Sequence, residues 1–213
     1  MENIFLTSSV NFSAKDIAAR FGITGRLVFV TTASEPKRER SDLKWQQEDK
    51  IALENVGFDV FEYTITGKTQ KQLEEDFKDV DVIYVSGGNV FYLLEKAKES
   101  GFEIVVKDLL SKGKKYIGTS AGSILAGPDI YPAYYLDAGG EAKNLKDYKG
   151  ISLVDFTILP HWGSEHFKDR YLNQRLEHAY KLGYKLILLN DNQYVAVDGG
   201  KYRIIDVSKD YET

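Results

Sequence analysis

The sequence predicts an α/β fold in which helices cover both faces of a mostly parallel sheet. Short runs rich in β-branched residues alternate with longer segments of helical periodicity, which is typical of such a sheet. Near the end of the chain, two alternating runs in 193–206 meet at Gly199-Gly200, a pattern that predicts a C-terminal β-hairpin. The 213 residues are 43% hydrophobic, enough for a core, so we expect one domain over 1–213.

The expected strands and helices follow one another along the chain. Ser13-x-x-Asp16 reads as a capping box that opens the first helix. A long helical segment over 41–56 ends at Gly57, a residue suited to a helix C-terminus. Further helices are expected at 70–78, 89–100, 103–112 and 165–182, and strands at 3–7, 26–31, 59–64, 81–86, 115–119, 156–159 and 185–189.

Composition and charge argue against several classes of protein. The formal net charge is −4, whereas nucleic-acid binders usually carry a basic stripe, so we expect no nucleic-acid partner. The chain has no cysteine, which excludes disulfides and a thiolate nucleophile. No apolar run approaches the roughly 18 residues of a membrane span, and the first residues do not resemble a signal peptide. We therefore expect a cytoplasmic protein without a membrane partner.

Three strand ends carry polar or flexible residues. They are Ser86-Gly87-Gly88-Asn89, Gly118-Thr119-Ser120-Ala121-Gly122, and Leu159-Pro160-His161-Trp162. In open α/β sheets, ligands bind beyond the carboxyl ends of the strands. A hydroxyl, an imidazole and glycine amides at these ends are the components of a serine hydrolase site.

Ser120 lies in the pattern G-x-S-x-G between an apolar run and a short helical segment. Strand, sharp turn and helix form the setting in which this spacing makes a nucleophile elbow. The amide of Ala121 would then lie at a helix N-terminus, where it can face an oxyanion. The alternative is an ordinary glycine-rich turn that happens to carry a serine.

A serine nucleophile needs a base, and the chain has three histidines. His166 and His178 fall in the helical segment 165–182 and are expected at its surface. His161 follows an apolar run and Pro160, which holds the strand exit rigid. His161 is therefore the candidate base, against the alternative of a histidine that merely ends a strand.

The acidic partner of the histidine is the least defined member of the site. Five carboxylates lie between Ser120 and His161, which is the order found in α/β-hydrolases. We favour Asp137, because its long loop can fold back over the strand ends, with Glu141 as second choice. The other candidates are Asp129, Asp147 and Asp155.

The glycine pair Gly87-Gly88 follows a buried strand and precedes a helix that begins near Asn89. The amide of Gly88 can supply a second oxyanion donor. The same design can cradle a phosphate, although the chain has neither a Walker loop nor a dinucleotide fingerprint. A tight turn that requires small residues is the third interpretation.

Taken together, "SGGN", "GTSAG" and "LPH" in this order resemble the serine peptidase family of aspartyl dipeptidase (dipeptidase E) and cyanophycinase, peptidase family S51. The resemblance implies a three-layer α/β/α sandwich similar to class I glutamine amidotransferases. It also implies a nucleophile at Ser120, a base at His161, oxyanion amides at Gly88 and Ala121, and no metal or cofactor. Asp137 is an inferred match, because the loop after the elbow helix is longer here than in the dipeptidase.

The resemblance further implies hydrolysis of short peptides, with an acidic N-terminal residue as one preference. That preference requires a cation near the site, for which Arg170 and Arg175 are candidates, and Asn89 is a further candidate for substrate binding. Two other functions use the same residues or scaffold: a non-catalytic domain that binds a small ligand, and an esterase for small acyl groups. A monomer and a homodimer are both compatible with the sequence.

Overall fold

The order of the strands in the sheet decides where the candidate residues meet. The computed structural model describes residues 3–37, 43–134 and 139–208. The main sheet has seven strands in the order β3-β2-β4-β5-β1-β8-β9. Strands β1 to β5 pair in parallel, and β8 and β9 join antiparallel as the expected hairpin. The strands are β1 (Ile4–Thr7), β2 (Gly25–Val30), β3 (Phe58–Tyr63), β4 (Val82–Val85), β5 (Lys115–Thr119), β8 (Gln193–Asp198) and β9 (Lys201–Asp206).

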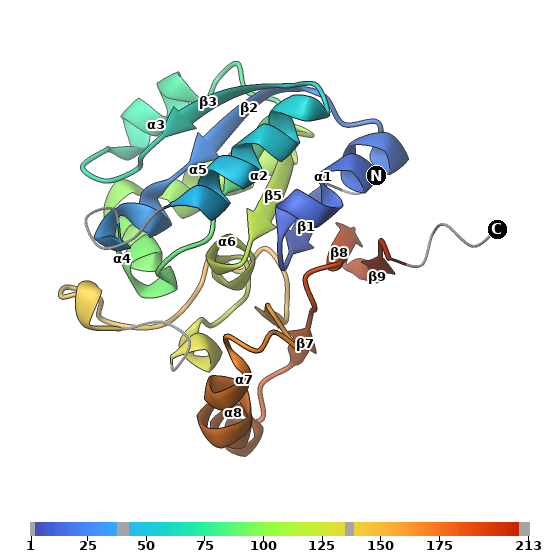
Figure 1. Ribbon diagram of the computed structural model, residues 1–213. Coiled ribbons are helices and arrows are strands. Elements are labelled where there is room, and N and C mark those ends of the chain that lie inside the picture. Colours follow the sequence, from blue (N-terminus) through green and yellow to red (C-terminus); the bar gives the residue numbers. More distant parts are fainter. Residues whose placement is uncertain (1–2, 38–42, 135–138, 209–213) are drawn as a thin grey trace.

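Helices cover both faces of this sheet, which confirms the predicted α/β architecture (Figure 1). One face packs against α1 (Val10–Phe21) and α2 (Lys44–Asn55). The other face packs against four helices and carries the larger apolar cluster. These helices are α3 (Gln70–Asp76), α4 (Val90–Ser100), α5 (Phe102–Ser111) and α6 (Ala121–Leu125).

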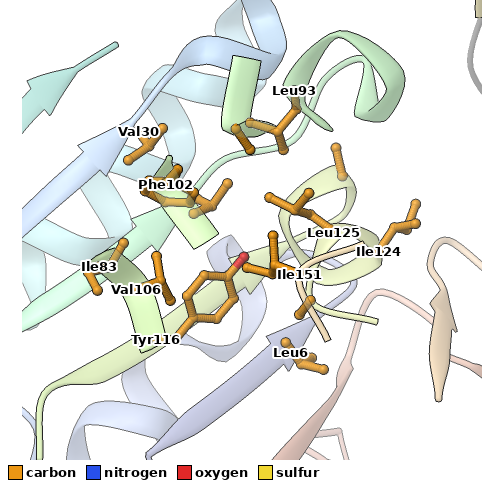
Figure 2. Close-up of a cluster of buried hydrophobic side chains, with 14 of the residues drawn as sticks. Leu6, Val30, Ile83, Leu93, Phe102, Val106, Tyr116, Ile124, Leu125 and Ile151 are labelled. Carbon is orange, nitrogen blue, oxygen red and sulfur yellow. The ribbon is translucent and has the colours of Figure 1, made fainter. Parts of the chain in front are cut away.

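The two apolar clusters arise from the alternation of side chains along each strand. In β2, Leu27 and Phe29 join the cluster under α1 and α2, whereas Val28 and Val30 join the cluster on the opposite face. Figure 2 shows the second cluster, in which Tyr116 of β5 lies among aliphatic side chains. Its hydroxyl donates to the carbonyl of Gly122 in α6, at 2.7 Å. Tyr116 thereby ties the helix after Ser120 to the sheet.

A second, smaller sheet carries the segment around His161. Strand β6 (Thr157–Leu159) pairs in parallel with β7 (Leu186–Leu188). Between them, α7 (Lys168–Arg170), a π-helical turn (Tyr171–Arg175) and α8 (Leu176–Leu182) form one helical stretch. In Figure 1 this stretch projects away from the main body of the molecule.

The predicted start of the first helix is wrong. Helix α1 begins at Val10 with Ser9 in the N-cap position, so Ser13 lies inside the helix. The Ser13 hydroxyl donates to the carbonyl of Ser9, as serine often does within a helix. A true capping box occurs instead at Thr69 and Gln72, where α3 begins.

Candidate active site

Ser120 lies in the sharp turn between β5 and α6. Its φ is +50° and its ψ is −108°, a strained conformation for a residue with a side chain. The Ser120 amide donates to the carbonyl of Thr7 at 3.1 Å, which ties the turn to the end of β1. A Cβ atom on Gly118 would lie 2.7 Å from the backbone of Gly122, so the turn requires glycine there.

His161 follows β6 and Pro160 and reaches the serine. Its Nε2 lies 3.0 Å from Ser120 Oγ, within hydrogen-bond distance. The backbone of His161 has φ +61°, and the amide of Trp162 donates to the Leu189 carbonyl at 2.9 Å. The imidazole stacks on the Phe167 ring, with 5.0 Å between centroids and 12° between planes. The ring is thus fixed between the serine and an aromatic wall.

Asp191 accepts a hydrogen bond from the other ring nitrogen of His161. Its Oδ1 lies 2.7 Å from Nδ1, and because an ionised carboxylate only accepts, Nδ1 carries the proton. This hydrogen bond, together with one from the Ser8 hydroxyl, holds the pKa of Asp191 below its usual value despite partial burial. Nε2 is then free to accept from Ser120, which is the orientation that a serine nucleophile requires.

Ser8 forms hydrogen bonds with both Asp191 and His161. Its buried hydroxyl donates to Asp191 Oδ1 at 2.7 Å and accepts the backbone amide of His161 at 2.7 Å. Ser8 directly follows β1, the strand beside β5. It therefore links the main sheet, which carries Ser120, to the loops that carry the histidine and the aspartate.

The structure describes four of the five acid candidates from the sequence. Asp137 falls outside the described residues, and Glu141 lines the cleft. Asp147 pairs with Lys98, and Asp155 pairs with Lys185 at 2.8 Å. Asp129 is partly buried and accepts the Tyr131 amide at 2.7 Å.

Sequence reasoning missed Asp191 because the acid was expected between Ser120 and His161, whereas Asp191 follows His161 in the chain. The expected strand 185–189 held the signal, since Asp191 follows its end closely. Parallel strands end at the same edge of a sheet, so the residues after β6 and β7 are neighbours. Ser8 was missed for a different reason. It follows the first strand, whose end is not one of the three strand ends on which the prediction of the site was based.

The glycine pair after β4 lies against the serine. A Cβ atom on Gly87 would lie 3.3 Å from Ser120 Cβ, and one on Gly88 would lie 2.2 Å from the Ala33 carbonyl oxygen. Gly88 also has φ +140°, and it lines the cleft above Ser120. Ala121 begins α6, so its amide belongs to the first turn, where helix amides lack an intrahelical acceptor.

A cleft of about 540 Å³ opens over Ser120 and His161. Asn89 lines it, although its side-chain oxygen already accepts the amides of Phe91 and Tyr92 as the N-cap of α4. Arg170 lines the cleft too, with its guanidinium 5.8 Å above the Phe167 ring. The structure does not bring Arg175 to this cleft, because that side chain is buried and donates to the Tyr131 carbonyl at 2.9 Å.

The described residues hold neither a metal-binding group nor a membrane-spanning helix. Over 3–37, 43–134 and 139–208, no three histidine, aspartate or glutamate side chains gather as a metal site would require. In the same part of the chain, no helix has the length and apolar character needed to cross a membrane.

Comparison with known proteins gives a consistent result over almost the whole chain. The model of the family described as Peptidase family S51 matches residues 5–205. An uncharacterized peptidase of Listeria monocytogenes is 31% identical over 205 residues, covering 93% of this chain and 96% of the relative. A protein of Drosophila melanogaster named a probable alpha-aspartyl dipeptidase is 30% identical over 141 residues, covering 62% of this chain and 56% of its own.

Solved structures share the fold. A crystal structure of a Listeria monocytogenes protein, assigned provisionally to peptidase E, superposes with a TM-score of 0.84 at 27% identity. The superposition covers 97% of this chain and 98% of the Listeria monocytogenes chain. A peptidase from an acI-B1 Actinobacterium superposes with a TM-score of 0.68 at 14% identity, covering 96% of this chain and 88% of its own, a likeness of fold alone.

Proposed function

Because this chain belongs to peptidase family S51 and is a serine-type peptidase, we propose that Ser120, His161 and Asp191 hydrolyse short peptides through an acyl-enzyme. The observation that carries this proposal is the continuous chain of hydrogen-bond distances from Ser120 Oγ through His161 to Asp191. The two steps are 3.0 Å and 2.7 Å. The expected acid, Asp137, is thereby replaced in the proposal by Asp191.

In the first step, Ser120 Oγ attacks the carbonyl carbon of the peptide bond while His161 Nε2 takes its proton. Asp191 keeps the imidazole in the tautomer that leaves Nε2 unprotonated, and it stabilises the imidazolium that forms. The amides of Gly88 and Ala121 are placed to stabilise the oxyanion of the tetrahedral intermediate. His161 then gives its proton to the leaving amine.

In the second step, water attacks the ester between Ser120 and the acyl group. His161 Nε2 takes a proton from that water to form the second tetrahedral intermediate. As this intermediate collapses, the bond between Oγ and the acyl carbon breaks, His161 returns the proton to Oγ, and the acid is released. The Phe167 ring on one side of the imidazole shields it from bulk water. The sequence of proton transfers needs no group beyond those that this chain supplies.

The size of the cleft favours a short peptide, and Arg170 favours an acidic first residue. A space of about 540 Å³ suits a ligand of a few residues rather than a folded protein. Arg170 lines that space, and an arginine guanidinium can bind a carboxylate in bidentate fashion. We assign Arg170 rather than Arg175 to this role, because Arg175 is not among the residues that line the cleft.

A dipeptide library tests the proposal, with the wild-type protein compared with Ser120→Ala. We expect the variant to lose about 10⁴-fold or more in kcat, as in other triads, while retaining its fold. A fluorophosphonate probe should label wild-type Ser120 and fail to label His161→Ala. Full activity in Ser120→Ala rules out the nucleophile, and turnover of acyl esters with none of any dipeptide favours an esterase.

A further inference from the structure

Asp49 is a buried carboxylate in the catalytic cleft that the proposed chemistry does not use. It lies in α2 and is 4% exposed, yet it lines the same space as Ser120 and His161. Its Oδ2 accepts the Tyr84 hydroxyl at 2.8 Å, and the carboxylate also accepts the backbone amide of Asn11. Among the described residues, no lysine, arginine or histidine lies within ion-pair distance of it.

Such an arrangement is costly unless a cation completes it. A buried carboxylate normally has a cationic partner or a full set of donors. A carboxylate has about four acceptor sites, and Tyr84 and Asn11 supply two donors from the described part of the chain. Burial raises the pKa of Asp49 to about 7, because the charged form has lost its hydration without gaining a cationic partner within the described residues.

The surroundings of Asp49 place it close to the reacting groups. The imidazolium form of His161 would attract the Asp49 carboxylate. Trp45 lies one turn earlier on the same helix, and a Cβ atom on Gly87 would lie 3.4 Å from its ring and 3.3 Å from Ser120 Cβ. The face of α2 that carries Trp45 and Asp49 therefore borders the cleft that Ser120 lines.

We propose that Asp49 binds the α-ammonium group of the first residue of the substrate. In a peptide cut after its first residue, the α-ammonium is separated from the attacked carbonyl carbon by a single carbon atom. An ammonium group supplies up to three donors and the missing positive charge. This assignment rests on the proposed function, and it makes the enzyme selective for free N-termini.

The assignment is compatible with an acidic first residue and explains how both charges of that residue are held. Arg170 would take the side-chain carboxylate and Asp49 the α-ammonium, each from a different element that lines the cleft. Two opposite charges at separate points fix the orientation of a small ligand better than either charge alone. A peptide with a blocked N-terminus would leave Asp49 buried and unpaired.

Binding to the Ser120→Ala variant tests the assignment without relying on turnover. The ligands are aspartyl-alanine and succinyl-alanine, which is the same molecule without its α-ammonium, measured by calorimetry. We expect the ammonium to improve the Kd by about tenfold or more, and Asp49→Asn in the Ser120→Ala background to abolish that difference. Asparagine keeps an acceptor for the Tyr84 hydroxyl, so the fold is preserved.

Glu54→Gln is the matched control, because Glu54 is an exposed carboxylate of α2 that neither lines the cleft nor shifts the pKa of Asp49. It should leave both Kd values unchanged. Equal affinity for the two ligands in Ser120→Ala overturns the assignment, whether or not Asp49→Asn folds. A third ligand, N-acetyl-lysyl-alanine, has a blocked N-terminus and an ammonium group on its side chain. If Asp49→Asn weakens the binding of this ligand and of neither other ligand, the assignment is also overturned. Failure of the nucleophile proposal would appear separately, as undiminished turnover by Ser120→Ala.

Discussion

Ser120 and His161, the proposed nucleophile and base, both hold backbone conformations that side chains disfavour. Ser120 has φ +50° and His161 has φ +61°. A residue held in such a region costs on the order of 1–3 kcal/mol, so the neighbours must hold it there. The hydrogen bonds from the Ser120 amide to Thr7 and from the His161 amide to Ser8 do so, at 3.1 Å and 2.7 Å. At the scale of single residues, the site is assembled at the expense of local stability.

Replacing Asp191 tests the acid of the triad. In Asp191→Asn, the amide can donate to Nδ1 and favour the tautomer with the proton on Nε2, which cannot accept from Ser120. We expect kcat to fall by about 10³- to 10⁴-fold with little change in KM, measured on the best dipeptide. Asp137→Asn and Glu141→Gln are the comparisons, and loss of activity in either, with Asp191→Asn active, would refute the role of Asp191.

Removing the Ser8 hydroxyl tests whether Ser8 fixes the positions of the two loops that carry His161 and Asp191. Ser8→Ala deletes a donor to Asp191 and the acceptor of the His161 amide, which leaves that buried amide without its partner. We expect a loss of about 1–3 kcal/mol in the free energy of unfolding in urea. kcat should also fall by about tenfold. Ser9→Ala is the control for the unfolding measurement, since the Ser9 side chain makes no capping hydrogen bond to α1. Equal losses of stability in both variants would contradict this role of Ser8.

At the scale of elements, the site is a set of strand ends. Ser8 follows β1, Gly88 follows β4, Ser120 follows β5, His161 follows β6, and Asp191 follows β7. Short runs rich in β-branched residues, separated by helical segments, were enough to predict these strands and to single out three of their ends. These runs were not enough to pair the strands, because pairing depends on contacts between residues far apart in the chain.

The acid shows where prediction from sequence stops. The segment 185–189 was expected as a strand, but nothing local in it says that it lies beside 156–159 in a separate sheet. That pairing brings Asp191 to His161. The start of α1 was misplaced for a related reason: Ser13 and Asp16 have the spacing of a cap, whereas the burial of Val10 and Ala14 against the sheet extends the helix one turn earlier.

The turn after β4 gives a prediction for a single element. In Gly88→Ala, the new Cβ would overlap the Ala33 carbonyl at 2.2 Å, and φ +140° is unsuitable for alanine. We expect a loss of about 2–3 kcal/mol in thermal or urea unfolding, and a fall in kcat because the oxyanion amide moves.

Gly113→Ala is the matched glycine, since it has φ +84° but open space around its Cβ position. It should cost about 1–2 kcal/mol and leave kcat unchanged. A Gly88→Ala variant as stable and as active as Gly113→Ala would show that the turn tolerates a side chain.

At the scale of the whole molecule, Asp49 makes global stability depend on pH. Its pKa in the folded protein, about 7, lies above the ordinary value of 3.8. Between those two pH values the folded state binds more protons than the unfolded state, so this carboxyl destabilises the fold progressively as pH rises through 7. Asparagine carries no such cost.

We therefore expect Asp49→Asn to be more stable than the wild type at pH 8, by about 2–4 kcal/mol relative to their difference at pH 4. Urea unfolding of both proteins across that range measures the difference, in which the opposite contribution of Asp191 cancels. A stability difference that does not vary with pH would mean that the carboxyl keeps its ordinary pKa in the fold.

The separate small sheet has one more consequence. Histidine and aspartate follow neighbouring strands of that sheet, whereas the nucleophile belongs to the large one. The distance between Ser120 Oγ and His161 Nε2 therefore depends on how the two sheets pack against each other, whereas the hydrogen bond between His161 and Asp191 lies within the loops of the small sheet alone.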